Sequence, residues 1–233
     1  LLPVYDRPMI MYLLTNLILL GVTDVFLIIN PKHRGQWELL FKEIQVGVKV
    51  ILIDQEHSEG IPQAITLCED HLLDSEFYMM LGDNLLLGTG LLQRFKAKVL
   101  KYPESAIIVG YDVINPEDFG VAEIDHLGHL TKVHEKPVTF ISNTAVTGLY
   151  KFDSDAIGYA KGLKKSLRGE YEICDIINKY IALDKCKVLK CNSSTDFWLD
   201  TGSIASLSSA TAFLRELSNN GFKALGNPGE FLV

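Results

Sequence analysis

The sequence predicts an α/β fold with a doubly wound, mainly parallel sheet and helices on both of its faces. In the first half of the chain, short runs of β-branched and aromatic residues alternate with longer segments of helical periodicity. Runs such as VFLII and FYMML are apolar at every position, which is typical of strands that helices cover on both sides.

The expected elements of the first half are bounded by residues that start or stop regular structure. Pro8 suits the first turn of a helix and Gly21 its C-terminal cap, while Asn30-Pro31 ends the strand that follows. We expect helices over residues 8–20, 36–44, 62–72 and 91–100. We expect strands over residues 25–29, 48–53 and 77–81.

The rhythm changes after residue 100, where strand-like runs follow one another through short links. This pattern favours antiparallel strands added to the sheet, over residues 106–113, 121–124, 130–133 and 145–152. Helices are then expected over residues 153–161, 170–183 and 203–217, with a strand over 187–190. No linker rich in Pro, Gly or Ser divides the chain, so we expect a single domain over residues 1–233.

Composition and charge exclude several classes of protein. Hydrophobic residues make up 48% and charged residues 22%, as in globular proteins. The net charge of −7 disfavours a broad basic surface for a nucleic-acid polymer, but it allows a local basic pocket for a phosphorylated small molecule. The longest nearly apolar stretch, residues 10–21, falls short of the roughly 18 residues of a membrane span, and no signal peptide pattern opens the chain. The scattered cysteines lack zinc-site spacing and indicate reduced thiols in a cytoplasmic protein: Cys68, Cys174, Cys186 and Cys191.

Two acidic residues are candidates for metal binding. Asp83 follows the strand FYMML within Gly82-Asp83-Asn84, and the ligands of open α/β sheets gather at the carboxyl ends of strands. Its carboxylate suits a Mg²⁺ ion that bridges phosphates, although all three residues also favour a simple turn. Asp200, in WLDTG, immediately precedes an expected helix, where a carboxylate also serves as a cap. Two acids that reach one pocket from distant segments could hold one Mg²⁺ between them.

Charged residues in two later segments are candidates for binding a sugar phosphate. Glu135-Lys136-Pro137 ends a strand, so that Glu135 could accept bonds from sugar hydroxyls and Lys136 could bind phosphate. An exposed ion pair explains these two residues equally well. The segment RGEYE, residues 168–172, is typical of a helix start with acidic residues in its first turn. Alternatively, Arg168 could bind a phosphate.

The loop QEHSEGIPQ, residues 55–63, links a strand to a helix at the same end of the predicted sheet as Asp83. The Gln55 side chain offers one donor and one acceptor, which matches the imide edge of thymine or uracil. Gly60 would let the backbone approach a flat base closely. The loop is therefore a candidate for reading a pyrimidine base.

These motifs occur in an order that resembles the sugar-phosphate nucleotidylyltransferases, over essentially the whole chain. The segments that carry the resemblance are LLPVYDRPMI, the Gln55…Gly60…Gln63-Ala64 loop, LGDN, FGVAEID, HEKP, SNTAVTGLY, RGEYEICDII and WLDTG. LLPVYDRPMI and SNTAVTGLY indicate the thymidylyl branch. The resemblance implies a Rossmann-like fold of the nucleotidyltransferase type, and the reaction of dTTP with α-D-glucose 1-phosphate to give dTDP-glucose and pyrophosphate.

The same resemblance implies roles for individual residues. The catalytic set would be Asp83, Asp200, Lys136 and Arg168, of which Asp83 and Asp200 would hold Mg²⁺. Contacts to the nucleotide would come from Gln55, Gly60 and Asp83. Contacts to the hexose would come from Gly120, Glu135 and Val146, and contacts to phosphate groups from Lys136 and Arg168. Paired chains, as a homodimer or tetramer, are expected from the family alone.

Two departures from the family pattern are visible. The glycine-rich loop that ends in Thr-Arg-Leu, and the Lys before Leu-Leu-Pro, do not occur in this sequence, nor does the first strand of the sheet. We expect the natural protein to supply them upstream of Leu1. Phe119 stands where relatives often have Tyr, which removes one hydroxyl near the sugar and leaves the hexose open.

Two further functions compete with the thymidylyl reaction. One is the same transfer with UTP or with another hexose 1-phosphate, because thymine and uracil differ by a methyl group worth only about 1–3 kcal/mol in a pocket. The other is a non-catalytic, regulatory homologue that binds nucleotide sugars, for which the missing loop is the only support.

Overall fold

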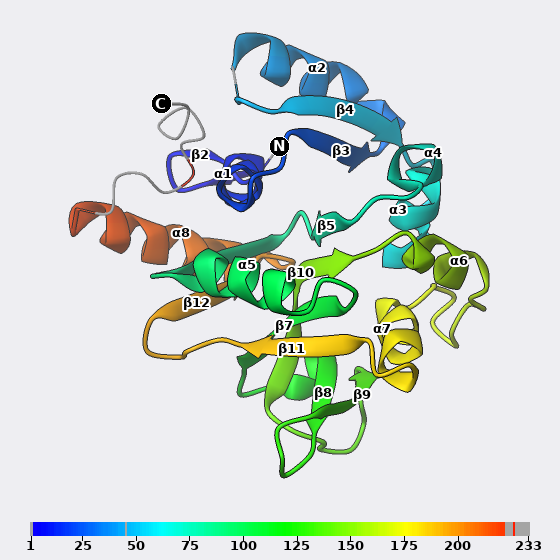
Figure 1. Ribbon diagram of the computed structural model, residues 1–233. Helices are drawn as coiled ribbons and strands as arrows, with labels where there is room; N and C mark the ends of the chain where they lie inside the picture. The colour runs from blue at the N-terminus through cyan, green and yellow to red at the C-terminus, as the bar shows by residue number, and fades with distance from the viewer. Residues whose placement is uncertain (1, 45, 222–225, 227–233) are drawn as a thin grey trace. The chain divides into compact units, whose positions relative to one another are not determined.

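The computed structural model describes residues 2–44, 46–221 and 226, and its contacts divide the chain into two compact units (Figure 1). Unit 1 comprises Leu1–Asp54, Met80–Gln93 and Asp196–Val233. Unit 2 comprises Gln55–Met79 and Arg94–Thr195. Each unit is therefore assembled from segments that lie far apart in the sequence.

The described residues of unit 1 form three separate strand pairs. The short strands β1 (Pro3–Val4) and β2 (Arg7–Pro8) form an antiparallel hairpin ahead of α1 (Ile10–Leu20), which Gly21 caps with a φ of 89°. Strands β3 (Asp24–Ile29) and β4 (Lys49–Asp54) run parallel, as their helical crossover requires. That crossover consists of η1 (Pro31–His33) and α2 (Arg34–Glu43).

The third pair of unit 1 was not expected from the sequence. Strand β6 (Asn84–Gly88) runs antiparallel to β12 (Asp196–Asp200), which α8 (Ile204–Asn219) follows. The predicted turn at Gly82-Asp83 is present, but the chain continues directly into β6. The run LLL within β6 is too short for its periodicity to reveal a strand.

Unit 2 is built around a mixed sheet in the order β11-β7-β10-β8-β9, with β5 paired to β10. Its strands are β5 (Phe77–Met80), β7 (Ala106–Asp112), β8 (Gly120–Ile124), β9 (Leu130–Glu135), β10 (Thr144–Phe152) and β11 (Cys186–Lys190). Strands β11 and β7 are parallel, whereas β7, β10, β8 and β9 pair antiparallel in turn. The predicted α/β class with a mixed sheet is confirmed, and so are the antiparallel strands expected after residue 100.

The helices from residue 61 to residue 182 follow the predicted order, apart from one break and the short helix η2, which was not predicted. They are α3 (Ile61–Leu67), α4 (Glu69–Leu72), α5 (Leu91–Lys101), η2 (Pro116–Asp118), α6 (Asp155–Lys161) and α7 (Ile173–Ala182). The single helix expected over 62–72 is interrupted at Cys68, whose φ of −97° and ψ of 8° lie outside the helical range.

Strand β10 is the centre of the core of unit 2, because every one of its residues is buried. The most unusual of these is Lys151, whose side chain is only 1% exposed. Its ammonium donates to Glu76 Oε1 at 2.7 Å and to the carbonyl oxygens of Pro103 and Ser105. A buried lysine is tolerated here because these acceptors replace water around its charge.

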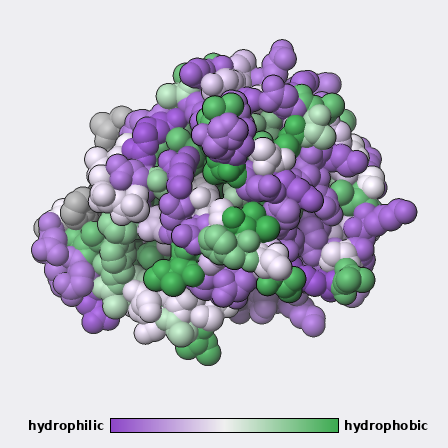
Figure 2. Space-filling view, turned by 90° about the horizontal axis from the view of Figure 1, so that it is seen from below, coloured by the Kyte–Doolittle hydropathy of each residue, from purple (hydrophilic) through white to green (hydrophobic). Residues whose placement is uncertain are grey.

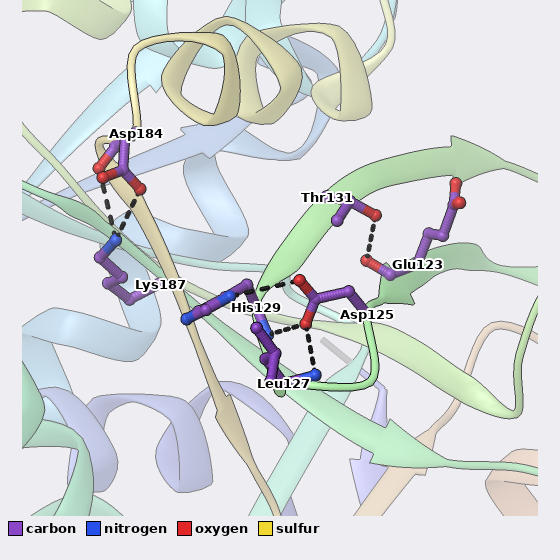
Figure 3. Close-up of polar contacts among 7 residues, drawn as sticks. All are labelled: Glu123, Asp125, Leu127, His129, Thr131, Asp184 and Lys187. Carbon is purple, nitrogen blue, oxygen red and sulfur yellow. Dashed lines mark hydrogen bonds and ion pairs between the residues drawn. The ribbon is translucent and has the colours of Figure 1, made fainter.

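The turn between β8 and β9 is closed by the side chain of Asp125 (Figure 3). Asp125 Oδ1 accepts from the backbone N–H groups of Leu127, at 2.9 Å, and His129, at 2.8 Å. These bonds, that from His129 most strongly, hold the pKa of Asp125 below its usual value. The closed turn keeps β8 and β9 in the register that pairs Gly120 with Glu135.

The surface is mostly polar on the face that Figure 2 shows, with hydrophobic side chains in small separate groups. Among the described residues, no helix is both long enough and apolar enough to span a membrane.

The burial of the Lys151 ammonium leads to a prediction about the stability of the fold. Lys151→Met keeps the aliphatic stem but leaves the carbonyls of Pro103 and Ser105 unsatisfied, so we expect a loss of about 1–3 kcal/mol in the free energy of unfolding. Lys161→Met is the control, because its ion pair with Glu69 is half-exposed and is worth about 1 kcal/mol or less. Urea denaturation of both variants measures the difference, and equal losses would contradict the proposed importance of the buried contacts.

Candidate active site

The carboxylates of Asp83 and Asp200 converge in unit 1. Asp83 lies in the turn before β6, and Asp200 is the last residue of β12, opposite Asn84 in the register. A Cβ atom added to Gly202 would lie 3.4 Å from Asp200 Oδ1 and 3.8 Å from Asp83 Oδ2. Both side chains therefore border one small space, which the absence of a side chain at Gly202 leaves open.

Hydrogen bonds from the paired strands fix Asp83 in place. The backbone N–H and the hydroxyl of buried Thr201 both donate to the Asp83 carbonyl oxygen, at 2.8 and 2.7 Å. Asn84 Nδ2 donates to Asp83 Oδ1 at 2.7 Å, and Asn84 Oδ1 in turn accepts from Trp198 Nε1 at 2.6 Å. The carboxylate is thus oriented by a chain of bonds that begins at a buried indole.

The expectation that Asp200 directly precedes a helix and caps it is wrong. Asp200 ends a strand, and α8 begins at Ile204. The N-cap is Ser203, which forms a reciprocal capping box with Ser206. Capping therefore does not explain the carboxylate at position 200.

The converging carboxylates fit a magnesium ion. The described residues contain no group of three or more His, Cys, Asp or Glu side chains able to enclose a metal on their own. Mg²⁺ usually takes only one or two protein carboxylates and completes its coordination with water and substrate phosphates. Two hard oxygen ligands beside an open glycine match that requirement.

A second group of candidate residues lies in unit 2, on three neighbouring strands. Val146 lies on β10, Gly120 on β8 and Glu135 on β9, and the register places Gly120 directly opposite Glu135. Glu135 Oε1 accepts from Arg168 at 2.8 Å, and Glu135 Oε2 accepts from the Cys174 thiol at 3.1 Å. The structure thus brings together four predicted elements of a sugar-phosphate site, together with a cysteine that the sequence assigned only to packing.

Glycine is required at position 120 by close packing. A Cβ atom there would lie 2.9 Å from Cys174 Sγ and 3.6 Å from Glu135 Oε2. Burial, and then the neighbouring Glu135 carboxylate, raise the pKa of Cys174 well above its usual value. The thiol therefore stays protonated and donates a hydrogen bond to Glu135.

Helix α7 brings Cys174 to Glu135 through a clamp on the edge strand β9. Asn178 Oδ1 accepts from Val133 N–H at 2.9 Å, and Asn178 Nδ2 donates to the Val133 carbonyl at 2.8 Å. Four helical residues rise about 6 Å, which is close to the length of two strand residues. Because Asn178 faces Val133, Cys174 one turn earlier faces Glu135.

Arg168 is surrounded by carboxylates in the loop before α7. Besides Glu135, its guanidinium lies 3.5 Å from Glu172 Oε1 and 3.7 Å from Glu170 Oε2. Buried Glu172 also accepts from Ser166 Oγ at 2.7 Å. The helix start expected at residue 170 is wrong, because α7 begins at Ile173 and residues 168–172 form the loop that carries this network.

Lys136 does not pair with Glu135, contrary to the ion-pair alternative. It is exposed, has a φ of 39°, and is anchored by its backbone N–H, which donates to the Phe119 carbonyl at 2.9 Å. Within the described part of the chain, its ammonium makes no ion pair.

The structure places Gln55 and Gly60 in one loop of unit 2. Gln55 Nε2 donates to Gln63 Oε1 at 2.7 Å. Gly60 has a φ of 111°, and a Cβ atom there would lie 2.2 Å from the Tyr171 carbonyl oxygen. Glycine at position 60 thus serves backbone packing, a need that the sequence did not reveal. Gln63, which the sequence indicated only as part of a motif, is the hydrogen-bond partner of Gln55.

Comparison with known proteins gives consistent matches. The model of the nucleotidyl transferase family matches residues 1–216. Glucose-1-phosphate thymidylyltransferases from Mycobacterium tuberculosis and Neisseria gonorrhoeae are 40% and 36% identical over 93% and 94% of this chain, and 75% and 76% of their own lengths.

Solved structures agree with these matches. A Bacillus anthracis structure, described as a glucose-1-phosphate thymidylyltransferase in complex with a sucrose, has a TM-score of 0.83 and 33% identity, and the match covers 93% of this chain and 86% of that one. A UDP-glucose pyrophosphorylase complexed with UDP-glucose has the same fold, with a TM-score of 0.81 and 20% identity over 92% of this chain and 89% of that one. The chain therefore belongs to the nucleotidyl transferase family and is a sugar-phosphate nucleotidyltransferase enzyme, similar to glucose-1-phosphate thymidylyltransferases.

Proposed function

We propose that this enzyme transfers a thymidylyl group from dTTP to α-D-glucose 1-phosphate and depends on Mg²⁺. The observation that carries the proposal is the convergence of Asp83 and Asp200 on the space beside Gly202. The choice of dTTP and glucose 1-phosphate is supported by the names of the relatives, which are 33–40% identical over most of the chain. A homo-oligomeric state and a cytoplasmic location belong to the same proposal and are supported by resemblance alone.

The reaction needs charge stabilisation rather than a covalent nucleophile. A phosphate oxygen of the sugar phosphate attacks the α-phosphorus of dTTP, a new P–O bond forms, and the bond to the β-phosphate oxygen breaks to release pyrophosphate. Asp83 and Asp200 would hold Mg²⁺, which when bound supplies positive charge to the phosphates of the nucleotide. The protein's own task is to align the two substrates in line and to balance the charge on their phosphates.

The unit 2 residues would bind the sugar phosphate. Glu135, oriented by Cys174 and Arg168, would accept hydrogen bonds from hexose hydroxyls, and Gly120, which lets Cys174 approach Glu135, would contact the hexose through its backbone. Val146 is buried, so we propose that it contacts the hexose through its backbone. Lys136 and Arg168 would place positive charge at the phosphate.

The nucleotide base would be read by the loop that carries Gln55. Its amide offers a donor and an acceptor to the imide edge of thymine. The positive φ of Gly60 sets the path of this loop against Tyr171. Gln55 alone does not distinguish thymine from uracil, so UTP is the proper competitor in a test.

Product formation tests the proposal directly. We expect the natural full-length enzyme with Mg²⁺ to form dTDP-glucose and pyrophosphate from dTTP and glucose 1-phosphate, measured by coupled pyrophosphate release. UTP, dCTP and galactose 1-phosphate serve as alternative substrates. A kcat/KM for UTP above that for dTTP would show that the enzyme transfers a uridylyl rather than a thymidylyl group. The absence of any turnover would support a non-catalytic, regulatory homologue.

Lys136 offers a test of the sugar-phosphate site. Lys136→Ala should lower kcat/KM for glucose 1-phosphate by roughly 10–1000-fold, because one charge-assisted contact to the phosphate is lost. Binding of dTTP alone, measured by calorimetry, should change little. Lys132→Ala, at an exposed position of β9, the strand that ends just before Lys136, is the control. Unchanged kinetics with glucose 1-phosphate in Lys136→Ala would show that Lys136 is a solvated surface residue with no role in binding the phosphate.

The carboxylates offer a test of metal binding. Asp83→Asn and Asp200→Asn should each raise the Mg²⁺ concentration for half-maximal rate by at least about tenfold, since even outer partners of metal ligands are worth about 10–100-fold. Electron paramagnetic resonance of Mn²⁺ with dTTP present should show the same weakening without turnover. Asp70→Asn, at an exposed position of α4, should match the natural enzyme. Wild-type metal affinity in both carboxylate variants would refute the shared site.

A further inference from the structure

A relay of polar side chains ends at Gln55 and lies entirely within unit 2. Lys165 Nζ lies 2.6 Å from Glu59 Oε1, and Gln63 Nε2 donates to Glu59 Oε2 at 3.3 Å. Gln63 Oε1 then accepts from Gln55 Nε2 at 2.7 Å. The relay thus connects a surface ion pair to the side chain proposed to read the base.

The chemistry of the relay fixes which way each amide faces. The Glu59 carboxylate only accepts hydrogen bonds, so it requires the NH₂ group of Gln63 on its side. The backbone N–H of Glu59 only donates, and it reaches Gln63 Oε1 at 3.0 Å, so it requires the carbonyl on the other side. Two independent partners therefore orient Gln63, and its carbonyl in turn requires the NH₂ group of Gln55.

The loop that carries the relay is itself held in place. Tyr171 N–H donates to the Glu59 carbonyl at 2.8 Å, and the Tyr171 backbone fills the space beside Gly60. The Lys165 ammonium lies 5.5 Å from the centre of the Tyr171 ring, within reach of a cation–π interaction. The Glu59 carboxylate also raises the pKa of Lys165, so the cation of the relay stays charged.

We infer that Gln63, oriented by Glu59 and Lys165, locks the Gln55 amide in the orientation that accepts thymine or uracil and rejects cytosine. This inference rests on the proposed function, in which Gln55 reads the base. Locked Gln55 offers its carbonyl oxygen and its remaining N–H, which suit the N3–H donor and O4 acceptor of thymine and uracil. Cytosine presents the reverse pattern, an N3 acceptor and an N4 donor. A reversed Gln55 amide would suit cytosine, but it would set the carbonyl oxygens of Gln55 and Gln63 against each other.

Gln63 is thus a positioning residue for base selection, and its role predicts a change in preference rather than a general loss of activity. The test compares kcat/KM for dTTP, UTP and dCTP in the natural full-length enzyme and in Gln63→Met, which keeps the length of the side chain but removes both polar groups. We expect the natural enzyme to prefer dTTP over dCTP by at least about 100-fold, because a hydrogen-bonding site strongly rejects a mismatched partner. Gln63→Met should reduce that ratio at least about tenfold and leave the ratio of dTTP to UTP within about twofold, since these two bases share one edge.

A control variant sharpens the test. Gln36→Met, at an exposed position of α2, should behave as the natural enzyme. If Gln63→Met does not fold, as judged by circular dichroism, Gln63→Ala takes its place in the same comparison.

The possible outcomes separate the inference from the proposed function. An unchanged ratio of dTTP to dCTP in Gln63→Met, or an equal loss with all three nucleotides, would overturn the relay while leaving the thymidylyl reaction intact. A natural enzyme that uses dCTP as well as dTTP would instead refute the proposed reading of the base by Gln55.

Discussion

The hydrogen bonds between Asn178 and Val133 determine most of the geometry around Glu135, Cys174 and Arg168. Strand β9 is the last strand in the order of its sheet, and its outer edge would otherwise present unsatisfied backbone groups. The Asn178 amide takes the place of a neighbouring strand, donating and accepting at one residue. Because the helix and the strand then advance together, Cys174 reaches Glu135, and the loop before the helix brings Arg168 to the same carboxylate.

A comparable constraint governs the carboxylates of unit 1. Their proximity follows from the antiparallel register of β6 and β12, which pairs Asn84 with Asp200. A slip of one residue would turn every side chain of β12 to the opposite face and separate the two acids. Buried Thr201 opposes such a slip, because it bonds twice to the Asp83 carbonyl.

Local patterns in the sequence predicted those parts of the fold that depend on local chemistry. The parallel pair β3 and β4 was predicted because its strands are long, β-branched and bounded by clear stop signals. Strand β6 was missed because its backbone is completed by β12, a partner more than a hundred positions later, which no local pattern reveals. The acids of RGEYE were assigned to a helix for the same reason: Tyr171 is instead held by Glu59, from a distant loop.

The candidate site shows the same difference between features that follow from local sequence and features that depend on distant segments. Local patterns predicted the carboxylates of Asp83 and Asp200 and the pair Glu135-Lys136 as candidate site residues, because residue type and the approximate ends of elements are local properties. Their partners depend on tertiary contacts: Glu135 pairs with Arg168 rather than with the adjacent lysine, and Gln55 is bound by a glutamine eight positions away. In the sequence, Cys174 is expected to behave as a small apolar residue. In the structure, its thiol donates a hydrogen bond to Glu135.

The indole of Trp198 gives the enzyme a built-in optical reporter. Its N–H is bonded to Asn84, and Asn84 is bonded to the carboxylate of Asp83, so the fluorophore is two hydrogen bonds away from that charge. Indole emission depends on the polarity and the electric field around the ring, and Trp198 is almost entirely shielded from water. The sequence has only one other tryptophan, Trp37, on α2. Replacement of Trp37 by phenylalanine would thus leave a single emitter whose spectrum follows the electrostatics of the acidic pair without any attached label.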